Sequence, residues 1–176
     1  MKKKISFTEA VYSFLSTLML AICTVLLVFM LFFRIAVVDG NSMNPTLYHG
    51  DKIIISGFLY SPDYGDIIVI GNGNSDAESI IKRIIALPGD TVDINFDSHI
   101  ISVNGKPISE DYKLNGAISE QGDVEFPLTV PENSYFVLGD NRNNSLDSRY
   151  SSIGCIPSDS IIGKALFGIN GRYILY

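Results

Sequence analysis

The chain opens with one long apolar segment and then changes to short apolar runs separated by turn residues. Residues 10–33 contain no charged side chain. As a helix they would extend about 36 Å, against a bilayer hydrocarbon core of roughly 30 Å. The apolar part of a cleavable secretory signal runs only about 7–15 residues, and no amphipathic stripe typical of a buried core helix is visible. The segment therefore predicts a single transmembrane helix over residues 10–33.

Charges on either side of this segment predict its orientation. Lysines occupy positions 2–4, whereas Arg34 alone follows closely. Because positive residues favour the cytoplasmic side of a membrane, we expect residues 1–9 to be a cytoplasmic basic N-terminus. Residues 34–176 would then form an extracytoplasmic domain of a single-pass protein of the cell (cytoplasmic) membrane.

Short apolar runs of β type follow the long segment, and no helical period is sustained after Phe33. They occupy residues 52–55, 66–70, 80–86, 92–94, 100–103, 106–108, 134–138 and 161–167. Asn104-Gly105 between two runs is a strong hairpin signal. The pattern predicts a mostly β fold class, an antiparallel and barrel-like domain after the helix.

Composition narrows the possible functions. The formal net charge is −6. Residues 1–34 carry a net +3 and the rest of the chain a net −9, so the body is acidic and no nucleic acid is expected as a partner. Cys23 lies in the apolar segment and Cys155 lies far beyond it, which predicts no disulfide and no cysteine metal site. The two histidines, His49 and His99, have no clustered partners, so no metal is expected.

A serine just after the apolar segment is a candidate nucleophile. Ser42 lies between Gly40, which permits a tight turn, and Pro45, which stiffens the chain. A hydroxyl on a rigid exposed turn can act in covalent catalysis. The alternative interpretation is an ordinary turn serine, and this segment alone does not decide between the two.

A lysine in the middle of an apolar run is the matching candidate base. Lys82 could be an edge-strand lysine or a salt-bridge partner. If it is desolvated, the pKa of its amine falls from ~10.4 by up to 3–5 units. The neutral amine can then take a proton near neutral pH. The polar segment 139–149 adds two aspartates and two arginines that could form fixed ion pairs, with Ser145 as a held hydrogen-bond partner.

Together these segments resemble the type I signal peptidase family, of the bacterial serine/lysine kind. The matching segments follow the family order: 42–47 (Ser-Met-Asn-Pro-Thr-Leu), 65–68 (Gly-Asp-Ile-Ile), 81–90 (Ile-Lys-Arg-Ile-x-x-Leu-Pro-Gly-Asp) and 139–149. A short body with one anchor resembles the Gram-positive members.

The resemblance implies a role for each matching residue. Ser42 would be the nucleophile, Lys82 the neutral general base, and Ser145 the group that orients the amine. The supporting structural network would comprise Asp140, Arg142, Asp147 and Arg149. The substrate-binding positions would be Val38, Gly40, Met43 and Ile81. Some members carry a serine where this chain has Gly40, so the oxyanion would be held chiefly by the Ser42 N–H, and a further donor is expected.

The resemblance also implies the partners. The substrates would be exported preproteins with small residues at positions −3 and −1, bound as an added strand. Membrane lipid would be a second partner and the protein secretion machinery a further candidate, with no cofactor.

Three other interpretations compete with general signal-peptide removal. One is a self-cleaving repressor-like protease, which the apolar segment and the missing DNA-binding segment disfavour. Another is a non-catalytic or specialised family member that assists assembly of a few surface proteins such as pilins. A third is a peptidase with few substrates. Penicillin-binding chemistry is excluded because Ser-x-x-Lys does not occur at Ser42.

Overall fold

The computed structural model of the chain describes residues 6–71, 79–110 and 117–168. It divides into two compact units, Met1–Arg34 and Ile35–Tyr176. The lysines at positions 2–4 lie outside the described residues, so the orientation that they predict remains a prediction.

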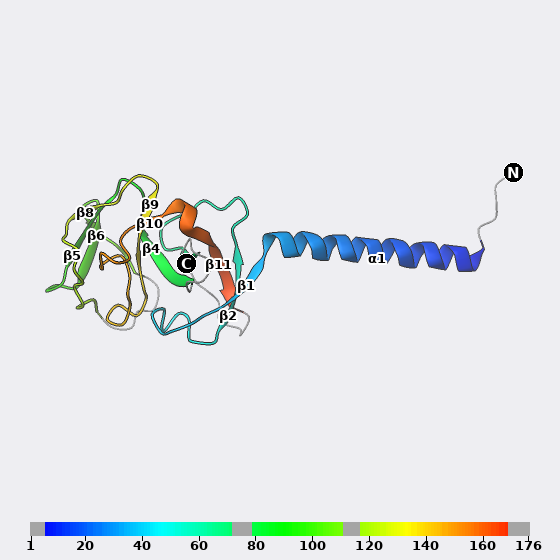
Figure 1. Cartoon of the computed structure of the whole chain (residues 1–176), viewed down its shortest axis with the longest axis horizontal. Helices are drawn as coiled ribbons and strands as arrows, with labels where there is room; N and C mark the ends of the chain where they lie inside the picture. The colour runs from blue at the N-terminus through cyan, green and yellow to red at the C-terminus, as the bar shows by residue number, and fades with distance from the viewer. Residues whose placement is uncertain (1–5, 72–78, 111–116, 169–176) are drawn as a thin grey trace. The chain divides into compact units, whose positions relative to one another are not determined.

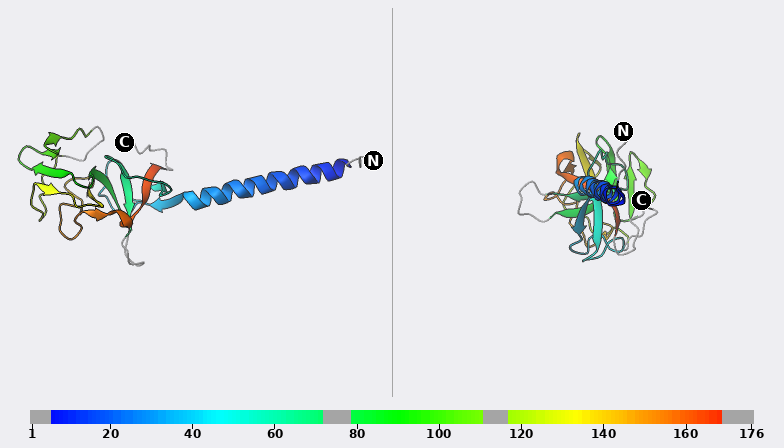
Figure 2. Two further views of the ribbon diagram at one scale, coloured as in Figure 1. Left: turned by 90° about the horizontal axis from the view of Figure 1, so that it is seen from above. Right: turned by 90° about the vertical axis from the view of Figure 1, so that its right-hand side faces the viewer.

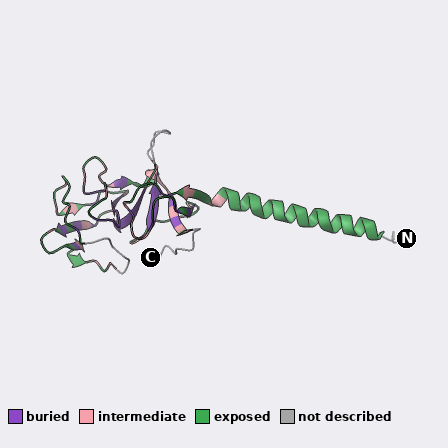
Figure 3. Cartoon of the chain, turned by 90° about the horizontal axis from the view of Figure 1, so that it is seen from below, coloured by how far each residue is buried: buried purple, intermediate pink, exposed green. Residues whose placement is uncertain are grey.

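The first unit is helix α1 (Phe7–Phe32), none of whose residues is buried (Figure 3). It begins three residues before the predicted segment, because the Glu9 carboxylate accepts the Ser6 N–H at 2.9 Å and so caps the helix start. Within the helix, the Thr17 and Thr24 hydroxyls donate to backbone carbonyls four residues earlier, at 2.8 and 2.9 Å. By length and composition α1 is suited to cross a membrane.

The second unit is built from two sheets, and the paired strands whose register is defined all run antiparallel (Figure 1). The larger sheet has the order β1 (Arg34–Val37), β2 (Lys52–Ser56), β11 (Ile161–Gly168), β3 (Ile67–Ile70), β4 (Ile80–Ala86), β9 (Ser134–Leu138) and β10 (Ile156–Pro157). The smaller sheet has the order β7 (Lys106–Pro107), β6 (Ile100–Val103), β5 (Thr91–Asn95) and β8 (Leu128–Thr129). A 3-10 turn, Ser158–Ser160, precedes β11. The mostly β, antiparallel prediction is confirmed.

Local sequence signals account for most of these strands. Asn104 and Gly105 have φ of 53° and 73°, as the two central residues of a type I′ turn require, and they join β6 to β7. Three short strands were not predicted, namely β1, β8 and β10. Each has two to four residues, too few for a periodic pattern to be visible.

Both faces of the larger sheet are covered at β3, β4 and β9, which explains the continuous apolar runs of these strands. Ile67 and Val69 of β3 pack in one core cluster with Ile81. Ile68 and Ile84 belong to a second cluster. A third cluster contains residues of β4, β5, β6 and β9 and joins the two sheets, which occupy different ends of this unit (Figure 2). Strand β4 therefore lies at the centre of the unit, where its side chains are fixed by packing.

Candidate active site

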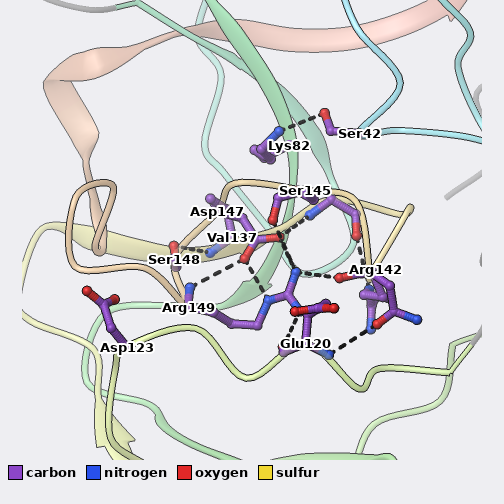
Figure 4. A network of polar contacts seen from close by, with 12 residues as sticks. Ser42, Lys82, Glu120, Asp123, Val137, Arg142, Ser145, Asp147, Ser148 and Arg149 are labelled. Carbon is purple, nitrogen blue, oxygen red and sulfur yellow. Dashed lines mark hydrogen bonds and ion pairs between the residues drawn. The ribbon is translucent and has the colours of Figure 1, made fainter.

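The candidate nucleophile and base meet, although they are far apart in the chain. Ser42 lies in the turn between β1 and β2, and Lys82 lies in the middle of β4. The Lys82 Nζ is 2.8 Å from the Ser42 Oγ, a hydrogen-bond distance (Figure 4).

Burial makes Lys82 an unusual lysine. Its residue is 4% exposed and pairs with Ile68, which is 0% exposed. Burial lowers its pKa to about 8, although the negative charge of Asp147 acts in the opposite direction. The edge-strand interpretation is wrong, because β4 lies between β3 and β9. No ion pair involves Lys82 within the described ranges, so the salt-bridge interpretation is not supported either.

The turn that carries Ser42 is anchored on both sides. Gly40 has φ of 80°, a conformation that glycine adopts readily, and its N–H donates to the His49 Nδ1 at 3.3 Å. Met43 and Leu47 are each 1% exposed and pack in the core, and the Leu47 N–H donates to the Met43 carbonyl at 3.0 Å. Ser42 therefore projects from a turn whose backbone is held by its neighbours.

The predicted pocket residues are neighbours. Val38, Met43 and Ile81 belong to one core cluster with residues of β2, β3 and β11. Gly40 is exposed beside them in the same chain segment. These three apolar side chains thus form one apolar floor. In the sequence they lie close to the two reactive groups, Ser42 and Lys82.

The segment 139–149 contains one of the ion pairs expected within it. Arg149 donates to both carboxylate oxygens of Asp147, at 2.8 and 2.9 Å, and both side chains are fully buried (Figure 4). The Asp147 Oδ2 also accepts the Gly139 N–H at 3.0 Å. A bidentate pair of this kind fixes geometry, so it holds the backbone at Gly139.

The other two ion pairs use partners that the sequence analysis did not identify. Asp140 binds Arg83 of β4 through two hydrogen bonds of 2.8 and 2.7 Å. Arg142 pairs with Glu110 and donates to the Gly139 carbonyl at 3.1 Å. An arginine in an apolar run signals a buried carboxylate partner, so Arg83 could have been found from the sequence, whereas Glu110 carried no signal.

Gly139 and Ser145 lie close to the nucleophile. A Cβ added at Gly139 would meet the Ser145 Oγ at 2.2 Å and the Ser42 carbonyl oxygen at 2.5 Å. The Ser145 Oγ is buried and has no hydrogen-bond partner among the described residues. A buried hydroxyl without a partner costs stability, which is the kind of feature found at functional sites.

Gly139→Ala is expected to lower any turnover that depends on Ser42 at least about tenfold, because the added methyl group would displace the Ser42 backbone. The measurement is the turnover number beside thermal melting. Gly71→Ala is the control, since its added Cβ would meet the Ile162 side chain, at 3.1 and 3.2 Å, and would approach the Ser160 carbonyl oxygen only to 3.9 Å. Equal activity of the two variants would contradict the close approach at Gly139.

The chain matches known proteins over nearly its whole length. The model of the family described as signal peptidase, peptidase S26, matches residues 11–169. The chain belongs to this family. Membership supports removal of signal peptides by a protease, and it confirms the resemblance seen in the sequence.

Individual relatives agree with the family match. Signal peptidase I S of Bacillus subtilis (strain 168) is 34% identical over 94% of this chain and 92% of its own length. A signal peptidase I of Bacillus amyloliquefaciens is 36% identical over 94% and 91%. A crystal structure of a signal peptidase I from Enterococcus faecalis V583 has 36% identity and a TM-score of 0.48, and covers 60% of this chain and 97% of that chain.

Proposed function

We propose that this chain is a membrane-anchored serine endopeptidase that removes N-terminal signal peptides from exported preproteins. Ser42 is the nucleophile and Lys82 the general base. The observation that carries the proposal is the 2.8 Å contact between the Lys82 Nζ and the Ser42 Oγ. The test is cleavage of a preprotein by the purified full-length chain in detergent or vesicles, with the products identified by mass.

The chemistry follows from a buried amine next to a hydroxyl. Neutral Lys82 takes the proton of Ser42, and the alkoxide attacks the carbonyl carbon of the scissile peptide. The resulting ammonium gives that proton to the departing amine as the C–N bond breaks. The same amine then activates the water that hydrolyses the acyl-enzyme ester. One residue thus acts as both base and acid in each half of the reaction.

The segment 139–149 keeps this pair in place. Ser145 orients the Lys82 amine in this proposal. Its buried hydroxyl beside Gly139 makes no hydrogen bond to Lys82 among the described residues, so its lone pairs are available to accept from that amine. The structural network consists of Asp140, Arg142, Asp147 and Arg149. The pairs of Asp140 with Arg83 and of Asp147 with Arg149 are fully buried, so removing one partner of either pair would leave an uncompensated charge.

Substrate selection rests on the apolar floor beside the nucleophile. Val38, Met43 and Ile81 are 2%, 1% and 9% exposed, so packing holds these apolar side chains in place. Small substrate residues at −3 and −1 would fit against them while the substrate backbone binds as an added strand near Gly40. A preprotein with a large residue at −1 should then be a poor substrate.

Helix α1 serves as the anchor in this proposal. The predicted division is a cytoplasmic N-terminus (1–9), a transmembrane helix (10–33) and an extracytoplasmic catalytic domain (34–176). The cell membrane then confines the enzyme to the plane in which signal peptides end, with lipid and the secretion machinery as neighbours. A non-catalytic role in assembling a few surface proteins such as pilins is not favoured, because candidate nucleophile and base are both present.

Cleavage is expected to rise with pH. The reactive form of Lys82 is the neutral amine, so below its pKa of about 8 the rate should fall about tenfold per pH unit, and above about pH 9 it should level off. The measurement is the turnover number from about pH 5 to 10, with melting curves at each pH to exclude unfolding. A rate that stays flat from about pH 5 to 9 would count against an amine base.

A further inference from the structure

The oxyanion site of this chain depends on the direction of one peptide group. This inference rests on the proposed function, in which Ser42 attacks the scissile carbonyl, and it assigns stabilisation of the resulting oxyanion to the Ser42 N–H. Because residue 40 is a glycine, no side-chain hydroxyl at that position adds a second donor. A donor contributes only when it points at the developing charge, so something must fix the peptide between Asn41 and Ser42.

Asn141 contacts the peptide groups on both sides of the nucleophile. Its side-chain Nδ2 donates to the Asn41 carbonyl at 3.0 Å, and its backbone N–H donates to the Ser42 carbonyl at 2.9 Å. The Asn41 carbonyl also accepts the Asn44 N–H at 3.2 Å. The peptide between Asn41 and Ser42 is trans, so its carbonyl and its N–H point in opposite directions. Holding the carbonyl of Asn41 therefore aims the N–H of Ser42.

The Ser42 N–H itself has no acceptor within the described part of the chain. Asn141, by contrast, sits in a rigid turn. It is 6% exposed, and its carbonyl accepts the Asn144 N–H at 2.9 Å. Gly139, two residues earlier, is held by Asp147 through its N–H. The Asn141 side chain thus holds the carbonyl side of the peptide, and the Ser42 N–H on the other side is available to a ligand. A preorganised oxyanion site requires both.

We propose that Asn141 is a positioning residue that orients the Ser42 N–H toward the oxyanion of the transition state. It does not touch the substrate and does not set the basicity of Lys82. Its loss should therefore lower the turnover number and leave both the KM and the pH profile unchanged.

The test compares two asparagines in the same segment. Asn141→Leu keeps the branched shape and adds no charge, and it removes the donor to Asn41. Asn143→Leu is the control, because within residues 6–71, 79–110 and 117–168 the Asn143 side chain makes four hydrogen bonds to residues 117, 119 and 120 and none to the nucleophile turn. In the full-length chain with a preprotein substrate, Asn141→Leu should lose about tenfold to a hundredfold in turnover number. Asn143→Leu should stay within about twofold.

A second readout isolates the oxyanion. The Ser42 hydroxyl adds to the carbonyl carbon of a peptide aldehyde that has the cleavage-site sequence. The adduct places an oxyanion-like oxygen in the site. Its affinity should fall at least about tenfold in Asn141→Leu, whereas the affinity of the matching product peptide should not change.

Several outcomes would overturn the inference while leaving the proposed function standing. One is an Asn141→Leu variant that cleaves with the turnover number of the wild-type chain. Another is a shifted pH midpoint in that variant. If neither Asn141→Leu nor Asn141→Ala folds, Asn141 is needed for the fold and the positioning role is wrong. If the wild-type chain cuts no preprotein, the proposed function itself fails.

Discussion

Ser42→Ala is expected to lower preprotein cleavage by at least about 10⁴-fold, because it removes the atom that forms the acyl-enzyme in the proposed mechanism. The fold should survive. Met43 and Leu47 anchor the turn in the core, and the Ser42 backbone carbonyl still accepts the Asn141 N–H. The measurement is the turnover number of the full-length variant, with circular dichroism melting on the same preparation.

Ser98→Ala is the control for this substitution. Ser98 lies on an exposed turn after β5, so its hydroxyl should matter neither to cleavage nor to melting. A second check is to trap a labelled acyl-enzyme by lowering the pH after the reaction has started. This species should form in the wild-type chain and be absent in the alanine variant. A folded Ser42→Ala protein that cuts at more than about a tenth of the wild-type rate would remove Ser42 from the mechanism.

Where the sequence predicts this fold well, the signal is local. The boundaries of β4 and β9 coincide with the predicted apolar runs. The Asn104-Gly105 turn has the conformation that its residues favour. The approach of Lys82 to Ser42 is not local, because it depends on which strands pair. This approach could be expected for two reasons only. A lysine in an apolar run required an explanation, and the order of the segments resembles that of a known family.

Contacts that cross between strands could not be predicted in this way. Arg83 pairs with Asp140 because Arg83 lies opposite Leu138 in the pairing of β4 with β9. Neither segment alone predicts that register. Asn141 is a similar case, since an asparagine in a polar loop has the composition of an ordinary turn. Its contact with Asn41 depends on how the loop after β9 packs against the turn before β2.

Lys82→Met is expected to lower cleavage about as far as Ser42→Ala does, because no other base approaches the Ser42 hydroxyl in the described residues. Methionine keeps the unbranched shape of lysine and fills the same space in the core. Cleavage at about pH 9 is the sharpest measurement, since the wild-type amine is then mostly neutral. Appreciable cleavage by the folded variant at that pH would rule out Lys82 as the base.

The stability of the same variant should change in the opposite direction. In the folded chain, burial lowers the pKa of Lys82 to about 8 from the ordinary value of 10.5. Protonated Lys82 therefore destabilises the fold below about pH 8, by up to about 3 kcal/mol, and this cost disappears as the pH approaches 10.5. Losing the hydrogen bond to Ser42 costs only about 0.5–1.5 kcal/mol. Lys82→Met should thus melt higher than the wild-type chain at about pH 7, with a smaller difference at about pH 10. Exposed Lys106, changed to methionine, should affect neither melting nor cleavage. A lower melting temperature for Lys82→Met at neutral pH would mean that the amine stabilises this fold, and the catalytic explanation for its burial would lose its basis.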